Sequence, residues 1–487
     1  MKHSIFNKYL LVTVILFGVS VTLRLIAFFQ TEYANGWDAY FYLVQVKALV
    51  EEVSMHSPDN ALVYPLLRLV YWICGDYVLS FKLVAAILSG TLTIVFFLLG
   101  RSWGKSFGLG VLLAAITIFS PHLTYFAAQF PKNLLGLILF GFLLHTWRWP
   151  ITIPGLLTLI LGFFGHKLTF GLSLIYVFLY LVFTSMPMKW IMISLIGVSI
   201  GLAAFLFSGG PELLKLGGRF DGLIADNLHW APASFLQDFG SLVSPYWQIE
   251  IWVSVVLYGF ISIAAAILYF LTEKEDPAIF SLLGLMTFLV LPIWTWSLTG
   301  FSYRFFLVFV LLAPLLLIFL RSISGKGIYF VALALIFLGV LSYKSYDPQR
   351  HDPPYELYHY ISAKAAELLE EEEVELVIAH NSLAEVFTFT TGIDGMPWRP
   401  DYTINNEGLW RLATDVREQF LSHYLEKEAF SSVKIVTRSY FLVREDVWQS
   451  FLSAVREDDI ELFEGLNTWK NPSRIRPAFL NGSKKAK

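Results

Sequence analysis

Cysteine and charge are both scarce in this chain. Its 487 residues include a single cysteine, Cys74. One thiol cannot build an intramolecular disulfide framework or a cysteine-based metal cluster, so redox chemistry is not expected. Only 15% of the residues are charged, whereas about a quarter are charged in a typical soluble domain. The same chain is 56% hydrophobic and 17% aromatic, which is typical of a polytopic membrane protein.

Clusters of positive charge are also scarce. The net charge is −3, and the clearest basic cluster is a short tail made of Lys484, Lys485 and Lys487. Proteins that follow a nucleic-acid backbone need more clustered cations, so no nucleic-acid partner is expected. The first apolar run is too long for a signal peptide and is not followed by a small-residue cleavage site. It is expected to be a retained transmembrane helix.

Long apolar runs are abundant. A helix needs about 20 apolar residues to cross the hydrocarbon of a bilayer, and about eleven segments are candidates, of which the fourth and fifth are short. The predicted fold class is therefore a polytopic α-helical membrane protein. The candidate segments lie near residues 9–29, 77–99, 107–127, 133–147, 152–165, 168–186, 190–208, 250–271, 278–297, 303–320 and 327–343.

The basic residues of the short loops predict an orientation. Lys2 and Lys8 place the N-terminus in the cytoplasm, because cytoplasmic loops are enriched in Lys and Arg. Alternating crossings then place the loops 31–76 and 208–249, and everything after Tyr343, on the extracytoplasmic face. A multi-pass protein of the cell membrane, plasma or inner, is expected.

Composition changes after the last apolar run, which predicts two domains. Residues 1–345 are expected to form the transmembrane domain and residues 346–487 a soluble extracytoplasmic α/β domain. In the second, residues 374–380, 431–443 and 459–465 have the pattern of strands, and 355–373 and 445–457 that of amphipathic helices.

An acidic residue stands at the beginning of the first extracytoplasmic loop, in "NGWDAYFYLVQVKALVEE". Asp38 precedes a run whose apolar and aromatic positions recur at helical spacing, typical of a helix lying on the membrane surface. One interpretation is an N-cap, in which the carboxylate accepts backbone N–H groups and stabilises the helix by about 1 kcal/mol. The other is a functional carboxylate.

The motifs that follow carry a resemblance. The stretch "YPLLRLVYWICGDYVLSFKLVAAILSG" supplies Tyr64, Pro65, Gly75 and the pair Ser89 and Gly90. With the preceding acidic residue, this order resembles the GT-C class of integral-membrane glycosyltransferases, in particular the protein O-mannosyltransferase and aminoarabinose (lipid A) transferase branch. The usual double proline is absent, and Tyr64 occupies its first place.

The resemblance implies roles for further residues. Lys167, in "FFGHKLTFGLSL", and Arg304, in "LTGFSYRFFLVF", match landmarks that look suited to bind the phosphate of a lipid-linked sugar, with Lys132 as a third cation. The alternative for Lys167 is snorkelling of a lysine to the water interface. Asp38 would be the catalytic base. The expected substrate pocket contains Trp37, Tyr40, Tyr64, His166 and Tyr303, although an interfacial aromatic belt accounts for the aromatic clusters equally well.

Two departures from relatives concern metal. Where many relatives carry a second carboxylate, this chain has Gln129, Lys132 and Asn133. The Trp-Trp-Asp-Tyr-Gly motif of metal-requiring oligosaccharyltransferases does not occur after residue 343. Neither a bound metal nor another cofactor is therefore expected.

The resemblance as a whole implies a membrane glycosyltransferase. It would move a sugar from a polyprenyl-phosphate donor, dolichyl or undecaprenyl, to a glycan, lipid or protein acceptor on the extracytoplasmic face, with inversion. The partners would be that lipid-linked donor, the acceptor and membrane lipids. The alternative is a transporter or flippase of polyprenyl-linked sugars, which would need charges along a path in mid-membrane.

Overall fold

The computed structural model describes twelve stretches of the chain and one isolated residue. They are residues 2–53, 55, 59–146, 153–185, 245–272, 276–291, 301–344, 346–347, 352–370, 376–398, 409–414, 439–444 and 468–470. The chain divides into two compact units. The first contains Met1–Ala27, Asn60–Val63 and Leu83–Asp347, and the second contains Phe28–Asp59, Tyr64–Lys82 and Pro348–Lys487.

The first unit is a helical bundle, and the chain is a mostly helical, multi-span membrane protein. Among the described residues, six helices are long and apolar enough to span a bilayer, or seven spans if a bent pair counts as one. The six candidate spans are Tyr9–Phe28, Tyr77–Ser102, Lys167–Ser185, Gln248–Ile267, Tyr303–Arg321 and Gly327–Lys344.

The predicted segments correspond closely to the helices observed. Three of them form apolar helices shorter than a full span, α7 (Pro131–Thr146), α8 (Ile153–Gly165) and α14 (Pro277–Leu289). The segment expected at 190–208 lies outside the described residues. The count of about eleven therefore stays a prediction.

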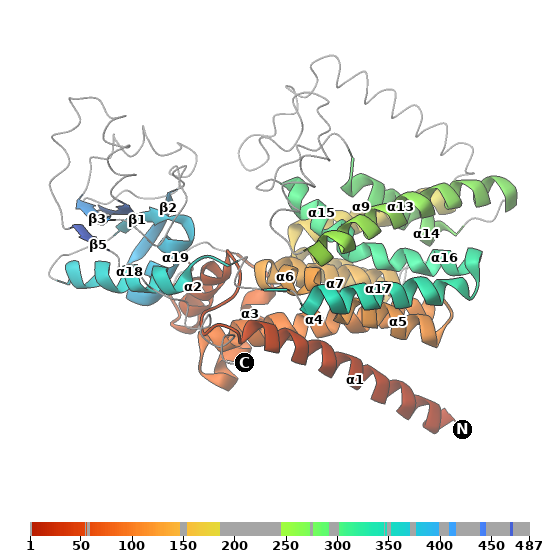
Figure 1. Ribbon diagram of the computed structural model, residues 1–487, viewed down its shortest axis with the longest axis horizontal. Coiled ribbons are helices and arrows are strands. Elements are labelled where there is room, and N and C mark those ends of the chain that lie inside the picture. Colours follow the sequence, from red (N-terminus) through yellow and green to blue (C-terminus); the bar gives the residue numbers. More distant parts are fainter. Residues whose placement is uncertain are drawn as a thin grey trace, which may run out of the picture. The chain divides into compact units, whose positions relative to one another are not determined.

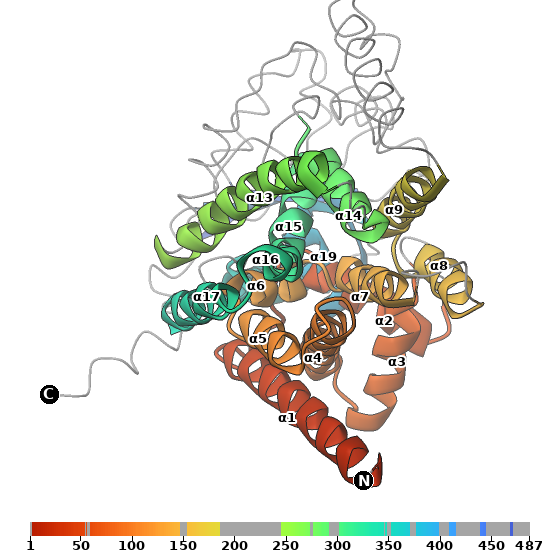
Figure 2. The same cartoon turned by 90° about the vertical axis from the view of Figure 1, so that its right-hand side faces the viewer.

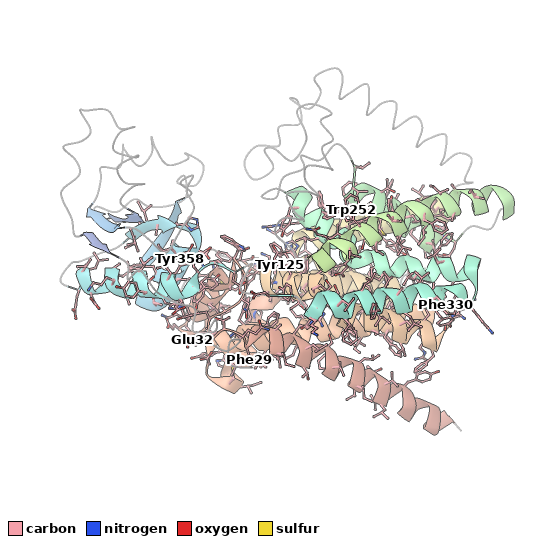
Figure 3. The ribbon with its side chains drawn as sticks, viewed as in Figure 1. Phe29, Glu32, Tyr125, Trp252, Phe330 and Tyr358 are labelled. Atoms are coloured by element: carbon pink, nitrogen blue, oxygen red, sulfur yellow. The ribbon has the colours of Figure 1, made fainter. Side chains whose placement is uncertain are left out.

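One span occupies the interior of the bundle. It consists of α15 (Phe301–Leu312), the 3-10 turn η2 (Ala313–Leu316) and α16 (Leu317–Ser324). Within Tyr303–Arg321, 89% of an 18-residue apolar window is buried. Seen along the bundle, α15 and α16 lie among α6, α7, α13 and α17 (Figure 2). The outer helices instead expose large apolar side chains, including Trp252 on α13 (Pro245–Thr272) and Phe330 on α17 (Gly327–Lys344), both labelled in Figure 3. An apolar exterior of this kind suits contact with lipid.

A break divides the third predicted segment into two helices. The sequence predicts one helix over 107–127, but α5 (Phe107–Ile118) and α6 (Pro121–Gln129) meet at 60°. Ser120 accepts a hydrogen bond from the Leu123 amide and Pro121 begins α6, a favourable start for a new helix.

The break leaves carbonyl groups of α5 without helical partners, and Arg24 binds them. Arg24 lies on α1 (Lys2–Phe28) and is fully buried. Its Nη1 donates to the Ile118 carbonyl, and its Nη2 donates to the carbonyls of Thr117, at 2.8 Å, and Ser120, at 3.2 Å. Because each unsatisfied carbonyl would be costly in an apolar interior, Arg24 stabilises the break.

The second unit combines helices with a five-stranded sheet (Figure 1). Its strand order is β2-β1-β4-β3-β5, in which β1 is parallel to β2 and β4, whereas β3 is antiparallel to β4 and β5. The strands are β1 (Leu376–His380), β2 (Asp394–Trp398), β3 (Leu409–Thr414), β4 (Ser439–Arg444) and β5 (Thr468–Lys470).

Within the part of this unit that the structure describes, four helices accompany the sheet. They are α2 (Ala39–Val50), α3 (Val63–Cys74), α18 (Tyr355–Leu368) and α19 (Asn381–Thr391). The helix α4 (Tyr77–Ser102) begins here and continues in the bundle. The unit that contains the C-terminal residues thus also takes in residues 28–59 and 64–82, which include most of the loop expected at 31–76 in the membrane domain.

The α/β character of the C-terminal residues agrees with the prediction. The strand expected at 374–380 is β1, and the end of the one expected at 431–443 is β4. The helix expected at 355–373 is α18. The predicted elements at 445–457 and 459–465 lie outside the described residues.

Candidate functional site

Asp38 stands at the N-cap position of α2, but its carboxylate does not cap the helix. Its backbone has φ −95° and ψ 9°, and no side-chain capping hydrogen bond is formed. The side chain is half-buried, whereas the neighbouring Trp37 is 48% exposed. The capping interpretation is therefore wrong for Asp38, and its carboxylate does not serve to begin α2.

Tyr40 and Tyr64, expected in a substrate pocket, lie in the interior of the second unit. Each is 1% exposed. The Tyr40 hydroxyl is 2.5 Å from Nε2 of His359, and the Tyr64 ring lies 5.9 Å from that of Tyr42. Burial raises the pKa of both phenols, so both are neutral. Their contacts position α2, and a role in substrate binding stays a prediction for them.

The cations predicted to bind phosphate belong to the first unit and gather at the N-terminus of α7. Lys132 lies in the first turn of α7, directly after Phe130 and Pro131. The Arg304 guanidinium, from the first turn of α15, lies 5.4 Å from the centre of the Phe130 ring. The centre of the Tyr303 ring lies 6.4 Å from that of Phe130, in an edge-to-face contact. The Tyr303 hydroxyl forms a hydrogen bond with the Tyr125 hydroxyl. Aromatic contacts thus hold Arg304 beside this helix end.

A glycine brings the turn that carries His166 and Lys167 against the same end of α7. This turn joins α8 to α9 (Lys167–Ser185). A Cβ atom on Gly136 would lie 2.9 Å from Cβ of His166 and would also collide with Thr169. Because Lys132 precedes Gly136 by four residues, it lies on the same helix face one turn closer to the N-terminus. Lys167 is exposed, and His166 is buried.

One further polar residue belongs to this group. Asn133, three residues before Gly136, is only 3% exposed, and its Nδ2 has no hydrogen-bond partner. An unpaired buried donor is unusual, and the backbone N–H groups of a first helical turn also lack helical partners. From the sequence, Asn133 stood out only as a replacement for a carboxylate. Its position directly after Pro131 and Lys132 was the signal available.

These residues form what we call the α7 cluster: Lys132, Asn133, His166, Lys167 and Arg304. Three of them are cationic and one is an unpaired amide. Lys132 and Asn133 lie in the first turn of α7, Arg304 lies beside Phe130 just before it, and the turn with His166 and Lys167 packs against Gly136 one turn further on. Such an arrangement favours an anion and in particular a phosphate group. The remaining predicted residues, Asp38, Trp37, Tyr40 and Tyr64, belong to α2, α3 and the turn before α2 in the second unit.

The architecture defines the class: a multi-pass helical membrane protein that also contains an α/β unit. No family model matches the chain, and no curated protein matches it in sequence. Among solved structures, it is similar to the crystal structure of the Archaeoglobus fulgidus oligosaccharyltransferase in the apo form, with a TM-score of 0.46 and 12% sequence identity. The match covers 79% of this chain and 64% of that one, so the chain spans less than two thirds of the length of that enzyme. Likeness at this level does not assign the chain to a family.

Proposed function

We propose that the chain is a membrane glycosyltransferase. It would transfer a sugar from a polyprenyl-phosphate donor to an acceptor on the extracytoplasmic face. The observation that carries the proposal is the α7 cluster, because cations and an unpaired amide gathered at a helix N-terminus of a membrane bundle suit a phosphate attached to a lipid. Lys132, Lys167 and Arg304 would hold that phosphate.

In the reaction, the acceptor hydroxyl oxygen attacks the anomeric carbon while the bond from that carbon to the phosphate oxygen breaks. The electron pair of the broken bond stays on the polyprenyl phosphate. The leaving group needs no proton if cations stabilise its negative charge, and the charged side chains of the α7 cluster supply this stabilisation. Arg304 suits two phosphate oxygens at once because its guanidinium is a planar fork of donors.

Asp38 accepts the proton of the acceptor hydroxyl. A half-buried carboxylate at the beginning of a helix, beside an exposed aromatic side chain, suits a general base that meets a sugar or another hydroxyl acceptor. A single displacement with one base inverts the configuration at the anomeric carbon. Trp37 offers an exposed indole beside Asp38, on which a sugar ring can stack.

The experiment is a donor-turnover assay. Purified protein in lipid is incubated with a mixture of polyprenyl-phosphate sugars and a membrane extract as acceptor, and each lipid-linked sugar is followed by mass spectrometry. We expect one donor to be consumed and the free polyprenyl phosphate to accumulate. If one donor co-purifies intact and no donor is consumed, the result favours a transporter or flippase over a transferase.

Asn133→Leu tests the phosphate site without disturbing the fold. Because Asn133 Nδ2 has no protein partner, its loss leaves nothing unpaired, and the thermal stability should be unchanged or higher. A hydrogen bond to a charged group contributes about 1.5–3 kcal/mol, so we expect the KM for the donor to rise about 10- to 100-fold. An unchanged KM would remove Asn133 from the phosphate site.

Lys167→Gln tests the charge of the cluster. Lys167 is exposed, so the substitution should not alter stability, whereas the KM for the donor should rise about tenfold or more as one phosphate contact is lost. The matched control is Lys326→Gln, also exposed, beyond the other end of the span Tyr303–Arg321. Equal KM values for the two variants would contradict the assignment of Lys167.

A further inference from the structure

The three residues that lead into Asp38 are held by the C-terminal part of the chain. We call Asn35, Gly36 and Trp37 the 35–37 segment. Asn35 Nδ2 donates to Asp352 Oδ2 at 3.0 Å, and the Gly36 amide donates to Asp352 Oδ1 at 2.7 Å. One carboxylate therefore binds two consecutive residues from a position 316 residues along the chain from Gly36. Hydrogen bonds to an ionised acceptor are about twice as strong as neutral ones.

Two hydroxyl groups bind the carbonyls of the same segment. Tyr355, in the first turn of α18, donates to the Gly36 carbonyl, and Ser382, in the first turn of α19, donates to the Trp37 carbonyl at 3.3 Å. Both the amide and the carbonyl of Gly36 thus have partners from the C-terminal residues. Gly36 is buried and has φ +104°, a conformation that side chains other than hydrogen strain.

The helix that Asp38 precedes is anchored by the same elements. Tyr40 OH lies 2.5 Å from Nε2 of His359 on α18. Burial lowers the pKa of His359 to about 4, so its ring is neutral near pH 7 and shares one hydrogen bond with the Tyr40 hydroxyl. At the other end of α2, Lys47 Nζ donates to the Phe389 carbonyl of α19 at 3.0 Å. The backbone on both sides of Asp38 is therefore fixed, which an accurately placed base requires.

We propose that Asp352 is a positioning residue for Asp38. It binds the 35–37 segment and so fixes where the backbone places the Asp38 carboxylate. The proposal rests on the proposed function, in which Asp38 is the base. If this is so, the residues after 347 contribute to catalysis, because they supply the groups that hold the 35–37 segment.

A suppressor pair tests this contact. Asn35→Asp places a carboxylate against the Asp352 carboxylate, and the repulsion should displace the 35–37 segment. Adding Asp352→Asn should restore the contact with donor and acceptor exchanged. The amide nitrogen at position 352 donates to the carboxylate at position 35, and the amide oxygen at position 352 still accepts the hydrogen bond from the Gly36 amide. Asp352→Asn alone should have only a small effect on kcat, because the Asn35 side-chain amide can flip and accept a hydrogen bond from the amide nitrogen at position 352.

The assay measures kcat and the KM for the donor separately for each variant. A misplacement of about 1 Å costs on the order of 100-fold in rate, so we expect Asn35→Asp to lower kcat by about this factor. The KM for the donor should not change, because phosphate binding belongs to the α7 cluster. The double variant should return kcat close to the wild-type value. Lys364→Met, which removes the ion pair with Glu367 within α18 and no contact to the 35–37 segment or to α2, is the matched control and should leave kcat unchanged.

Hydrogen–deuterium exchange of the peptide covering residues 34–42 supplies an activity-independent readout. Asn35→Asp should speed exchange there, and the double variant should slow it again. If wild type turns over donor and Asn35→Asp keeps both kcat and protection, the positioning role is overturned while the proposed function stands. If wild type turns over no donor, the proposed function fails and the catalytic role of Asp352 fails with it.

Discussion

Asp38→Asn is expected to abolish donor turnover while leaving the fold intact. The amide has the shape of the carboxylate but cannot take up the acceptor proton, and loss of a general base typically costs about 100- to 10,000-fold in rate. Because the Asp38 side chain makes no capping hydrogen bond, α2 does not lose a cap. Turnover by mass spectrometry should fall to background, and the melting temperature of the purified protein should change little.

The same unit contains an aspartate that does cap a helix, and it serves as the control. Asp76 Oδ1 accepts a hydrogen bond from the Leu79 amide at 2.6 Å, at the beginning of α4. Asp76→Asn keeps an oxygen acceptor and should retain turnover. If Asp38→Asn has the kcat of the wild type, Asp38 is not the base. A similar loss in both variants would indicate a nonspecific effect of removing negative charge.

The parts of the fold that sequence predicts well are those specified by local composition. Spans such as Tyr77–Ser102 are evident because a run of about 20 apolar residues is typical of a membrane-spanning helix and rare elsewhere. The break between α5 and α6 escaped the prediction although Ser120 and Pro121 are ordinary signals of a helix start, because the apolar run continues across them. The helix α19 was missed because it follows β1 without an intervening loop.

In the candidate site, too, some features are evident from local sequence and others depend on tertiary packing. Lys167 and Arg304 were singled out because they match landmarks of the resemblance and stand at the ends of apolar runs, where a cation is conspicuous, and their role in binding phosphate stays a prediction. The role of Gly136 depends on how closely α7 and the α8–α9 turn approach, and the bond from Gly36 to Asp352 joins residues 316 positions apart. Contacts of this kind come from tertiary packing, which a single sequence does not encode in any local pattern.

Arg24→Met is expected to cause the largest loss of stability. Arg24 is fully buried and donates to the carbonyls of Thr117, Ile118 and Ser120 at the break between α5 and α6. Methionine fills part of the volume but leaves these carbonyls without that donor, and each buried group left unsatisfied costs about 1–3 kcal/mol. The nearby Glu250, which accepts from Ser120 at 2.6 Å, also loses an attractive charge. Thermal unfolding in detergent should begin at a clearly lower temperature than for wild type.

Arg101→Met is the matched control for this substitution. The Arg101 guanidinium lies 3.9 Å from the centre of the Tyr9 ring, but the residue is exposed, and an exposed cation–π contact contributes about 0.5–1 kcal/mol. Equal melting temperatures for the two variants would contradict the role of Arg24 at the break. Arg24→Met also distinguishes a transferase from a transporter. If Arg24 only satisfies backbone carbonyls, donor turnover per folded molecule should be the same in Arg24→Met as in wild type. If Arg24 instead lies on a transport path through the membrane, the variant should lose its transport activity even where it is folded.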